Sequence, residues 1–191
     1  TGIGLISLTY VFFTLLDGSA KYLVQSVPVL VVVWLRFLTH ALLASARDLP
    51  PERQLDTINR ALNRRPYVED RQSDGARDYW ATPEEFLARG VGDCEDFAIV
   101  KYFALRELGY SPDQLRIVVL TDSIRGQVHA VLVVGRPGKA IVLDSLSSEL
   151  FPENLYRHYV PHVSVNEAGR WEHFGRAVVD PMARLPFDPA G

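Results

Sequence analysis

The sequence predicts an α+β fold, and three observations lead to this prediction. Apolar residues first recur at helical spacing, as Leu55, Ile58 and Leu62 do. Short runs rich in Val, Ile and Leu follow later and predict strands. The expected helices all precede the expected strands, an order that is typical of α+β domains rather than of alternating βαβ units.

Each expected element has its own local signal. The first helix covers about Glu52–Asn63. The second is capped by Thr82, has Pro83 in its first turn and ends at Gly90. The third follows Gly92-Asp93 and ends at Gly109, with Asp93 as the expected cap and Asp96 completing a capping box. Its expected core face holds Phe97, Val100, Ala104 and Leu108, and the expected strands are Leu115–Leu120, Val128–Val134 and Ala140–Leu143.

Charge divides the chain into unlike parts. Residues 1–46 hold only three charged residues, whereas the remainder holds 18 Lys/Arg and 22 Asp/Glu, a net charge of −4. No basic stripe is present, so nucleic acid is not an expected partner. We therefore expect hydrophobic membrane segments in residues 1–46, a folded domain in residues 47–176 and a Pro-rich tail in residues 177–191.

The hydrophobic part predicts N-terminal helices that attach the chain to a membrane. Val29–Ala46 is 18 residues long, near the lower limit of about 17–25 residues for a membrane-spanning helix. Asp17 and Lys21 lie one helical turn apart, so they can pair and lower the cost of immersion. Two membrane segments, one span with a reentrant stretch, and a buried pair of core helices all fit this pattern.

Cys94 is the candidate nucleophile. It is the single cysteine, which excludes an intrachain disulfide and a multi-cysteine metal site. Its expected place in the first turn of a helix favours a thiolate, because free N–H groups and the helix dipole lie there. Its neighbours in Gly92–Asp96 are too polar for a core position. The backbone N–H of Cys94 is the expected oxyanion donor, with Trp80 or Gln127 as candidates for a second.

A base and an orienting acid are predicted from the strands. His129 is the one histidine among five that falls inside an expected strand. The turn signal Gly135–Gly138 predicts a four-residue loop that places Val134 opposite Lys139. This register puts His129 opposite Asp144 on the same face of the hairpin. We therefore expect His129 to activate Cys94 and Asp144 to orient the imidazole.

The acids around Cys94 suggest a metal ion. Asp93, Glu95 and Asp96 would raise the pKa of the thiol above its usual value of about 8.5. Three carboxylates in four positions are suitable oxygen ligands for Ca²⁺, which would neutralise them. A solvated acidic helix terminus, favoured by the helix dipole, fits the same residues equally well.

Residues from about Asn59 to Trp171 resemble the bacterial transglutaminase-like cysteine peptidases. The resemblance is carried by Asn59-Arg60-Ala61-Leu62-Asn63, Asp78-Tyr79-Trp80-Ala81-Thr82-Pro83, Gly90-Val91-Gly92-Asp93-Cys94-Glu95-Asp96-Phe97-Ala98, Lys101-Tyr102-Phe103-Ala104-Leu105, Gln127-Val128-His129-Ala130-Val131-Leu132, Val142-Leu143-Asp144 and Val165-Asn166-Glu167. It implies a papain/transglutaminase-like core in which a helix bearing the cysteine packs on an antiparallel sheet. Residues 47–176 are then the peptidase domain.

The resemblance also implies site residues and a role. The family's Cys-His-Asp triad carries over to Cys94, His129 and Asp144. Its calcium-binding acids match Asp93 and Glu95, with Asp96 and, less closely, Asp74 as further ligands. The best-known members are periplasmic, calcium-dependent proteases that release large surface adhesins and so control biofilm attachment. We therefore expect a protein substrate and a periplasmic or inner-membrane-anchored location. Ser145 departs from the Asn that family members commonly have after the triad Asp.

Residues 1–46 resemble the start of the EamA-like drug/metabolite transporters instead, in Leu15–Tyr22 and Val33–Phe37. The likeness is too short to indicate a transporter, and a genuine anchor, a gene fusion and an assembly artefact all stay open. Two other functions fit the folded part. One is transglutaminase or amidase acyl transfer, and the other is a catalytically inactive, membrane-tethered binding module.

Overall fold

The computed structural model describes residues 40–69, 79–135 and 139–173. The chain divides into two compact units, residues 1–41 and 42–191, and the description that follows concerns the second. Among the described residues, no helix is both long and apolar enough to cross a membrane. The predicted N-terminal hydrophobic helices fall almost wholly, and the C-terminal tail wholly, outside the described residues. The three-part domain division therefore stays a prediction.

The order of elements confirms the α+β class. After a helical stretch at residues 42–47 come the helices α3 (Pro51–Leu62), α5 (Pro83–Arg89) and α6 (Cys94–Glu107). Two 3-10 helices are η1 (Pro112–Gln114) and η2 (Glu153–Leu155). The strands are β1 (Leu115–Asp122), β2 (Gln127–Val134), β3 (Ile141–Leu143), β4 (Phe151–Pro152), β5 (Tyr159–Asn166) and β6 (Gly169–Glu172). The last three strands were not predicted, because their sequence is polar and aromatic without clear alternation.

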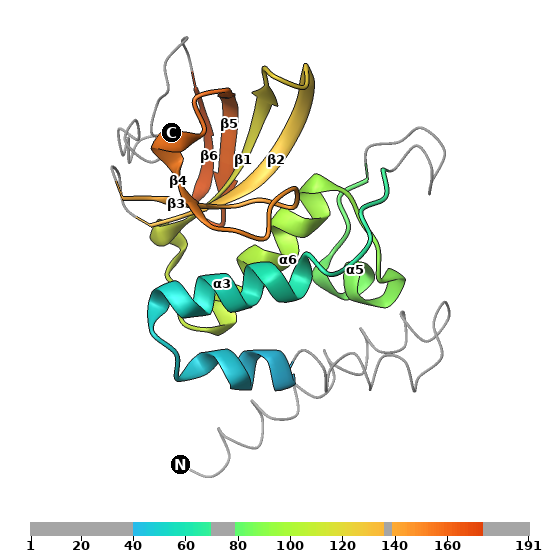
Figure 1. Cartoon of the computed structure of the whole chain (residues 1–191), viewed down its shortest axis with the longest axis vertical. Coiled ribbons are helices and arrows are strands. Elements are labelled where there is room, and N and C mark those ends of the chain that lie inside the picture. The colour runs from blue at the N-terminus through green and yellow to red at the C-terminus, as the bar shows by residue number, and fades with distance from the viewer. Residues whose placement is uncertain (1–39, 70–78, 136–138, 174–191) are drawn as a thin grey trace, which may run out of the picture. The chain divides into compact units, whose positions relative to one another are not determined.

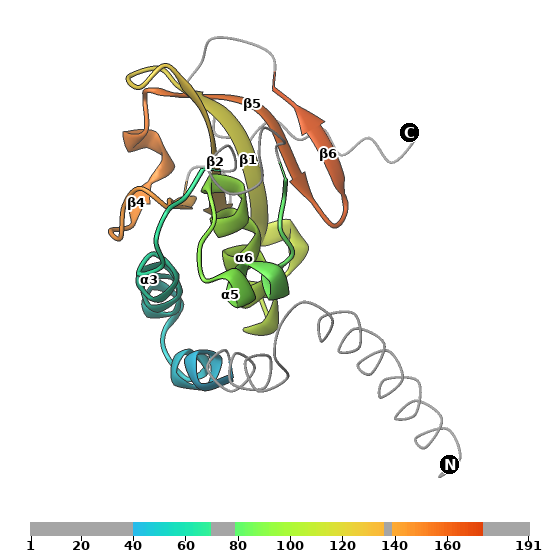
Figure 2. The ribbon, with the colours of Figure 1, turned by 90° about the vertical axis from the view of Figure 1, so that its right-hand side faces the viewer.

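The strands form one antiparallel sheet in the order β4-β3-β2-β1-β5-β6. Helix α6 packs against β1 and β2, while α3 and α5 pack against α6, as Figures 1 and 2 show. The cysteine-bearing helix is therefore the central helix of the domain. This arrangement confirms the predicted packing of that helix on an antiparallel sheet.

The two helix starts agree only partly with their predicted caps. Thr82 and Glu85 form the predicted capping box of α5, and Gly90 ends that helix at φ 71°. Asp93 stands at the N-cap of α6, but its side chain makes no capping hydrogen bond. Asp96 does not complete a capping box either, because its Oδ1 accepts a hydrogen bond from the Ala81 N–H at 2.7 Å. The start of α6 is thus tied to the loop before α5.

Two apolar clusters form the core, and their members alternate along the strands. The helix-side cluster includes Ile58, Phe86, Phe97, Leu105, Leu115, Ile117, Leu132, Val134 and Leu143. The second cluster consists of Val118, Leu120, Val131, Val133, Ala140, Val142 and Tyr159, with Tyr156 packed against it. This period of two is what a sheet buried on both faces requires.

The buried face of α6 differs from the predicted stripe. Phe97 and Val100 are buried as predicted, but Ala104 and Leu108 are only half-buried. The face instead continues through Lys101 and Leu105, both 0% exposed. A lysine therefore occupies a core position, which the apolar pattern did not indicate.

The register of the β2–β3 hairpin is shifted by two residues from the prediction. Val134 pairs with Ile141, not with Lys139, and Leu132 pairs with Leu143. The predicted four-residue loop was too short, since Ile141 rather than Lys139 is the first paired residue after the turn. A shift of two keeps every side chain on its face. His129 and Asp144 therefore still share a face, as diagonal rather than directly opposed neighbours.

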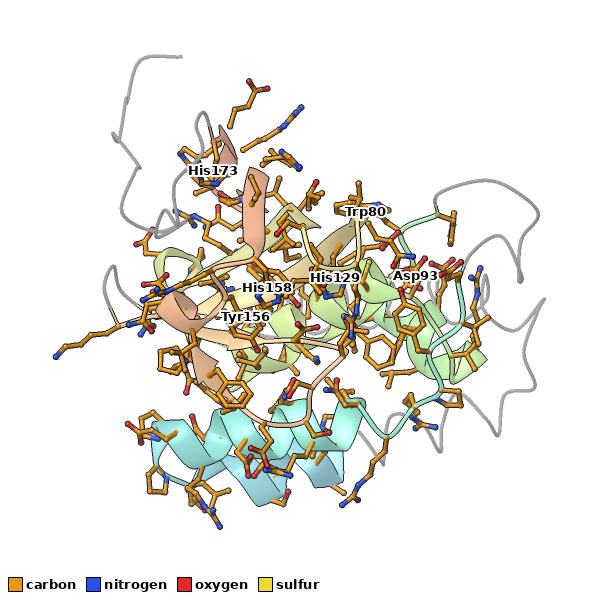
Figure 3. All side chains as sticks on the ribbon, turned by 45° about the horizontal axis from the view of Figure 1, so that its top comes forward. Trp80, Asp93, His129, Tyr156, His158 and His173 are labelled. Carbon is orange, nitrogen blue, oxygen red and sulfur yellow. The ribbon has the colours of Figure 1, made fainter. Side chains whose placement is uncertain are left out.

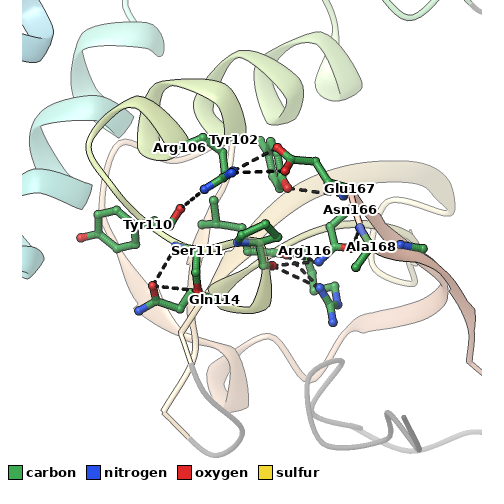
Figure 4. A network of polar contacts seen from close by, with 12 residues as sticks. Tyr102, Arg106, Tyr110, Ser111, Gln114, Arg116, Asn166, Glu167 and Ala168 are labelled. Atoms are coloured by element: carbon green, nitrogen blue, oxygen red, sulfur yellow. Dashed lines mark hydrogen bonds and ion pairs between the residues drawn. The ribbon is translucent and has the colours of Figure 1, made fainter. Parts of the chain in front are cut away.

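Polar contacts tie the β5–β6 hairpin to the helical layer, as Figure 4 shows. Arg106 of α6 forms an ion pair with Glu167, with 3.0 Å between Nε and Oε1. The Asn166 amide donates to the Pro112 carbonyl at 2.8 Å. These contacts fix the far end of β5, the strand that begins at Tyr159 in the second cluster.

Candidate active site

Cys94 is the first residue of α6 and is partly buried. Its sequence neighbour Gly92 forms a bridge with Tyr67, and the Gly92 carbonyl accepts the Val68 N–H at 2.9 Å. The Cys94 thiol donates a hydrogen bond to Glu95 Oε2 at 3.0 Å. The nucleophile candidate therefore sits at a helix start, as predicted, but its hydrogen-bond acceptor is a carboxylate.

The edge of β2 near Cys94 has no strand partner on one side. Strand β3 pairs with β2 only from Leu132 to Val134, so the edge of β2 is unpaired on that side at His129 and Ala130. A backbone hydrogen bond links Ala130 to the Cys94 sulfur. The start of α6 thus reaches the edge of β2 next to His129, although the thiol is not hydrogen-bonded to the imidazole.

The surroundings of Cys94 favour the thiol over the thiolate. Burial contributes most to raising the pKa of Cys94, followed by the charge and the hydrogen bond of Glu95. The Ala130 hydrogen bond acts in the opposite direction, and Asp93 adds a further increase. Glu95 and Asp93 therefore act in the direction predicted for the flanking acids, although burial contributes more.

His129 and Asp144 form a buried pair. His129 Nε2 lies 2.9 Å from Asp144 Oδ1, and the two residues are 5% and 1% exposed. Burial would raise the pKa of Asp144, but hydrogen bonds from His129, Tyr159 and the Leu146 N–H outweigh it and lower that pKa. Asp144 is therefore a carboxylate at neutral pH, so Nε2 of His129 carries the proton that it donates. The other ring nitrogen, Nδ1, keeps a lone pair in the neutral imidazole.

Helix α3 holds the loop that carries Asp144. Asn63 donates its side-chain amide to the Asp144 carbonyl at 2.7 Å and to the Ser147 carbonyl at 2.8 Å. Asn59 donates to the same Ser147 carbonyl at 2.9 Å. The hydroxyl of Ser145 has no hydrogen-bond partner within the described residues. The loop that carries the carboxylate is thus held through its backbone, and within the described residues the Ser145 hydroxyl makes no hydrogen bond to it.

The structure adds residues that the sequence reasoning missed. Tyr159 donates its hydroxyl to Asp144 Oδ2 at 2.6 Å. Lys101 is fully buried, and burial lowers its pKa to about 7, with the charge of Asp144 partly opposing that decrease. Tyr67 lies within hydrogen-bonding reach of the Cys94 sulfur. Lys101 had a signal, because it falls four residues after Phe97 and before Leu105, whereas Tyr159 lies on an unpredicted strand.

The three predicted metal ligands lie together at the start of α6. Asp93 and Glu95 are each 7% exposed and Asp96 is 1% exposed. Within the described residues, no group of three or more His, Cys, Asp or Glu side chains converges so that it can hold a metal ion. Asp74 lies outside those residues. Buried carboxylates match the hard oxygen ligands that Ca²⁺ takes, so the residues fit the ion in chemistry, while the ligand set stays a prediction.

The second oxyanion donor also stays a prediction. Figure 3 shows Asp93, His129 and Trp80, which come from the start of α6, from β2 and from the loop before α5. Trp80 is 42% exposed, and Gln127 is exposed at the start of β2. No contact of either side chain with Cys94 singles one of them out.

Comparison with known proteins identifies the family. The family model described as bacterial transglutaminase-like cysteine proteinase matches residues 44–178. Two solved structures of Legionella pneumophila LapG are similar, and each comparison covers 87% of the LapG chain. The calcium-bound form is 32% identical over 74% of this chain (TM-score 0.65), and the EGTA-treated form is 31% identical over 76% (TM-score 0.66). A comparison with curated protein sequences finds no match. The chain belongs to the bacterial transglutaminase-like cysteine proteinases and is a transglutaminase-like cysteine peptidase.

Proposed function

We propose that this peptidase is a calcium-dependent protease with Cys94 as nucleophile, His129 as general base and Asp144 as orienting acid. The observation that supports the triad best is the buried His129–Asp144 pair, with 2.9 Å between Nε2 and Oδ1. Its neighbour along β2, Ala130, is hydrogen-bonded to the Cys94 sulfur. The proposed thiol lies at the start of α6, the proposed base lies on β2, and the proposed acid directly follows β3.

The proposed reaction is acyl transfer to water. The thiol leaves Glu95, and Nδ1 of His129 takes its proton. The sulfur then bonds to the peptide carbonyl carbon, and the Cys94 N–H at the helix start donates to the oxyanion. His129 returns the proton to the leaving amine as the C–N bond breaks. Water, activated by the same imidazole, hydrolyses the thioester and frees the thiol.

Calcium has a defined place in this proposal. Asp93, Glu95 and Asp96 would hold it, together with acids outside the described residues such as Asp74. A bound Ca²⁺ supplies positive charge that offsets the carboxylates opposing a thiolate at Cys94. Two facts support the proposal, the burial of all three acids and the existence of calcium-bound and EGTA-treated LapG structures.

For the substrate we propose a large adhesin-type protein at the bacterial surface, released by cleavage from the periplasmic side. Residues 1–46 would hold the peptidase at the inner membrane, and cleavage would regulate attachment in a biofilm. The support is the family resemblance over Asn59–Trp171 and the membership established above.

The single cysteine makes a direct test possible. Iodoacetamide consumption by the full chain reports Cys94 alone. With calcium, the wild type is expected to react rapidly at neutral pH, and His129→Ala is expected to react about 100 times more slowly, the order of magnitude of a general-base contribution. Chelation of calcium with EGTA is expected to slow the wild type.

A matched histidine provides the control. His162→Ala removes an exposed imidazole that contacts Thr121 rather than the triad, and its alkylation rate should equal that of the wild type. If the wild type reacts slowly, and neither His129→Ala nor calcium changes its rate, the protease proposal is refuted. The catalytically inactive binding module then remains. Incorporation of a labelled primary amine into casein, in preference to hydrolysis, would favour the transglutaminase alternative.

A further inference from the structure

Tyr159 contacts both partners of the His129–Asp144 pair. Its hydroxyl donates to Asp144 Oδ2 at 2.6 Å. Its ring meets the His129 ring edge to face, with 5.8 Å between the centroids and 65° between the planes. Tyr159 is 9% exposed, so its hydroxyl requires a buried acceptor and the carboxylate provides it.

The sheet register explains how a residue of β5 reaches this pair. Strand β1 lies between β2 and β5, and Leu120 pairs with His129 on one side and with Pro161 on the other. Tyr159 lies two positions before Pro161 along β5, so it is on the same face as His129. Its hydroxyl reaches Asp144 Oδ2 on this face. The β1–β5 pairing continues to Asp122 opposite Tyr159 after an irregularity between Val119 and Leu120, so backbone pairing sets the position of Tyr159.

The ring of Tyr159 is itself held on both sides. Tyr156 stacks on it with 4.8 Å between the centroids, and His158 meets it at 4.4 Å. The Tyr159 N–H also donates to the Tyr156 carbonyl at 3.0 Å. The hydroxyl therefore has little freedom to leave the carboxylate.

We propose that Tyr159 is a positioning residue that holds the Asp144 carboxylate so that Oδ1 accepts the hydrogen bond from His129 Nε2–H. The inference rests on the proposed triad. Oδ1 accepts both His129 and the Leu146 N–H, while Oδ2 accepts Tyr159. Without the hydroxyl, a buried Oδ2 lacks a donor, and the carboxylate can turn away from the imidazole toward another donor. The Nε2–H tautomer, which keeps Nδ1 free for the thiol, is then no longer enforced.

The protonation states agree with this role. Burial raises the pKa of Tyr159, and the hydrogen bond to Asp144 raises it further. The same bond contributes to the lowered pKa of Asp144. Phenol donor and carboxylate acceptor therefore coexist over the whole range near neutral pH.

The test is Tyr159→Phe in the full chain with calcium present, since this change removes one oxygen and keeps the ring. In the wild type, ¹⁵N shifts of the His129 ring should report the Nε2–H tautomer. In the variant they should report a mixture, and the iodoacetamide rate of Cys94 should fall about tenfold, as expected for one hydrogen bond to a charged group. A merely packing role would leave the tautomer unchanged.

Tyr156→Phe is the matched control. It removes a buried hydroxyl from the same aromatic cluster, one that has no hydrogen-bond partner within the described residues. In this variant, the tautomer of His129 and the alkylation rate of Cys94 should match those of the wild type.

Asp144→Asn separates failure of this inference from failure of the triad. If Asp144→Asn leaves the alkylation rate unchanged, the triad itself is wrong. If Asp144→Asn slows the reaction but Tyr159→Phe leaves both the tautomer and the rate as in the wild type, the role of Tyr159 is refuted. Support requires that Tyr159→Phe adds nothing to Asp144→Asn, since a residue that acts through Asp144 has no effect once that acceptor is changed.

Discussion

Lys101 is an ionisable residue at a place where water cannot reach it. Its side chain is 0% exposed, its ammonium lies 5.7 Å from the Phe97 ring centroid, and within the described residues it has no hydrogen-bond partner. Burial lowers its pKa from 10.5 to about 7, against the attraction of Asp144. Between these two values the unfolded chain holds a proton that the folded chain has lost. The free energy of unfolding therefore rises with pH across this window, and below it Lys101 destabilises the fold by an amount that does not depend on pH.

We predict that Lys101→Met removes this pH dependence. Each pH unit within the window corresponds to about 1.4 kcal/mol, so the stability gained by the variant over the wild type should be about 2–3 kcal/mol larger at pH 6 than at pH 9. Urea unfolding of both proteins at the two pH values measures the difference. Lys139→Met, a change at an exposed lysine, should follow the wild type at both. Equal differences at pH 6 and pH 9 would show that Lys101 keeps its proton in the fold.

For single residues, the sequence predicted the chemical role better than it predicted the hydrogen-bond partners. Cys94, His129 and Asp144 were predicted from residue type and local pattern, and the structure places His129 against Asp144. The hydrogen bond from the thiol to Glu95 could not be predicted, because it depends on the rotamers that the two side chains adopt at the helix start. Nor was Tyr159 within reach of prediction, since its role depends on strand pairings over a distance of many residues.

At the scale of elements, the approach of α6 to its neighbours depends on a residue without a side chain. A Cβ added at Gly92 would lie 2.7 Å from Asp96 Oδ2 and 2.8 Å from Phe86 Cδ2. Such contacts force the start of α6 away from α5, and Cys94 moves with it. We predict that Gly92→Ala lowers the free energy of unfolding by about 1–3 kcal/mol, the usual cost of overpacking, and slows alkylation of Cys94.

Chemical unfolding and the iodoacetamide rate together test this element. Gly169→Ala is the comparison, because a Cβ there meets Trp171 at ordinary contact distances of 3.6 and 3.7 Å. It should change stability by less than about 0.5 kcal/mol. If Gly92→Ala behaves like Gly169→Ala in both measurements, the close approach does not position the nucleophile.

The elements themselves were predictable where local signals are strong. The capping box at Thr82 and the αL glycine at Gly90 placed α5 correctly. The β2–β3 register was wrong by two, because the signal Gly135-Arg136-Pro137-Gly138 marks a turn without fixing how many residues separate the paired strands. The error did no harm to the face assignment, since the side-chain period of a strand is also two. The sequence of β5 shows no alternation of apolar and polar residues, so this strand was not predicted. The contact of Tyr159 with Asp144 was missed for the same reason.

At the scale of the whole molecule, the order of helices and strands predicted the α+β class, but not the order of the strands in the sheet. The prediction for residues 1–46 falls almost entirely outside the described residues, and so do Asp74 and the C-terminal tail. Within the second unit, Leu43 and Ala46 are 7% and 0% exposed, and Leu43 belongs to the helix-side cluster. The last turns of the predicted membrane segment therefore contribute apolar surface to the core of the peptidase.

Calcium should act on the stability of the whole domain, because a ligand that binds only the folded state stabilises all of it. Asp93 and Glu95 are nearly buried acids that repel one another at one helix start. Free calcium at about 100 times its Kd is expected to add about 3 kcal/mol and to raise Tm by about 5–10 °C for a chain of this size. Thermal unfolding in calcium and in EGTA measures this shift without any assay of activity.

Asp93→Asn with Glu95→Gln should abolish the shift, whereas the exposed pair Glu107→Gln with Asp113→Asn should retain it. A calcium-induced shift that survives in the Asp93/Glu95 variant would place the ion elsewhere, and its absence from the wild type would argue against calcium altogether.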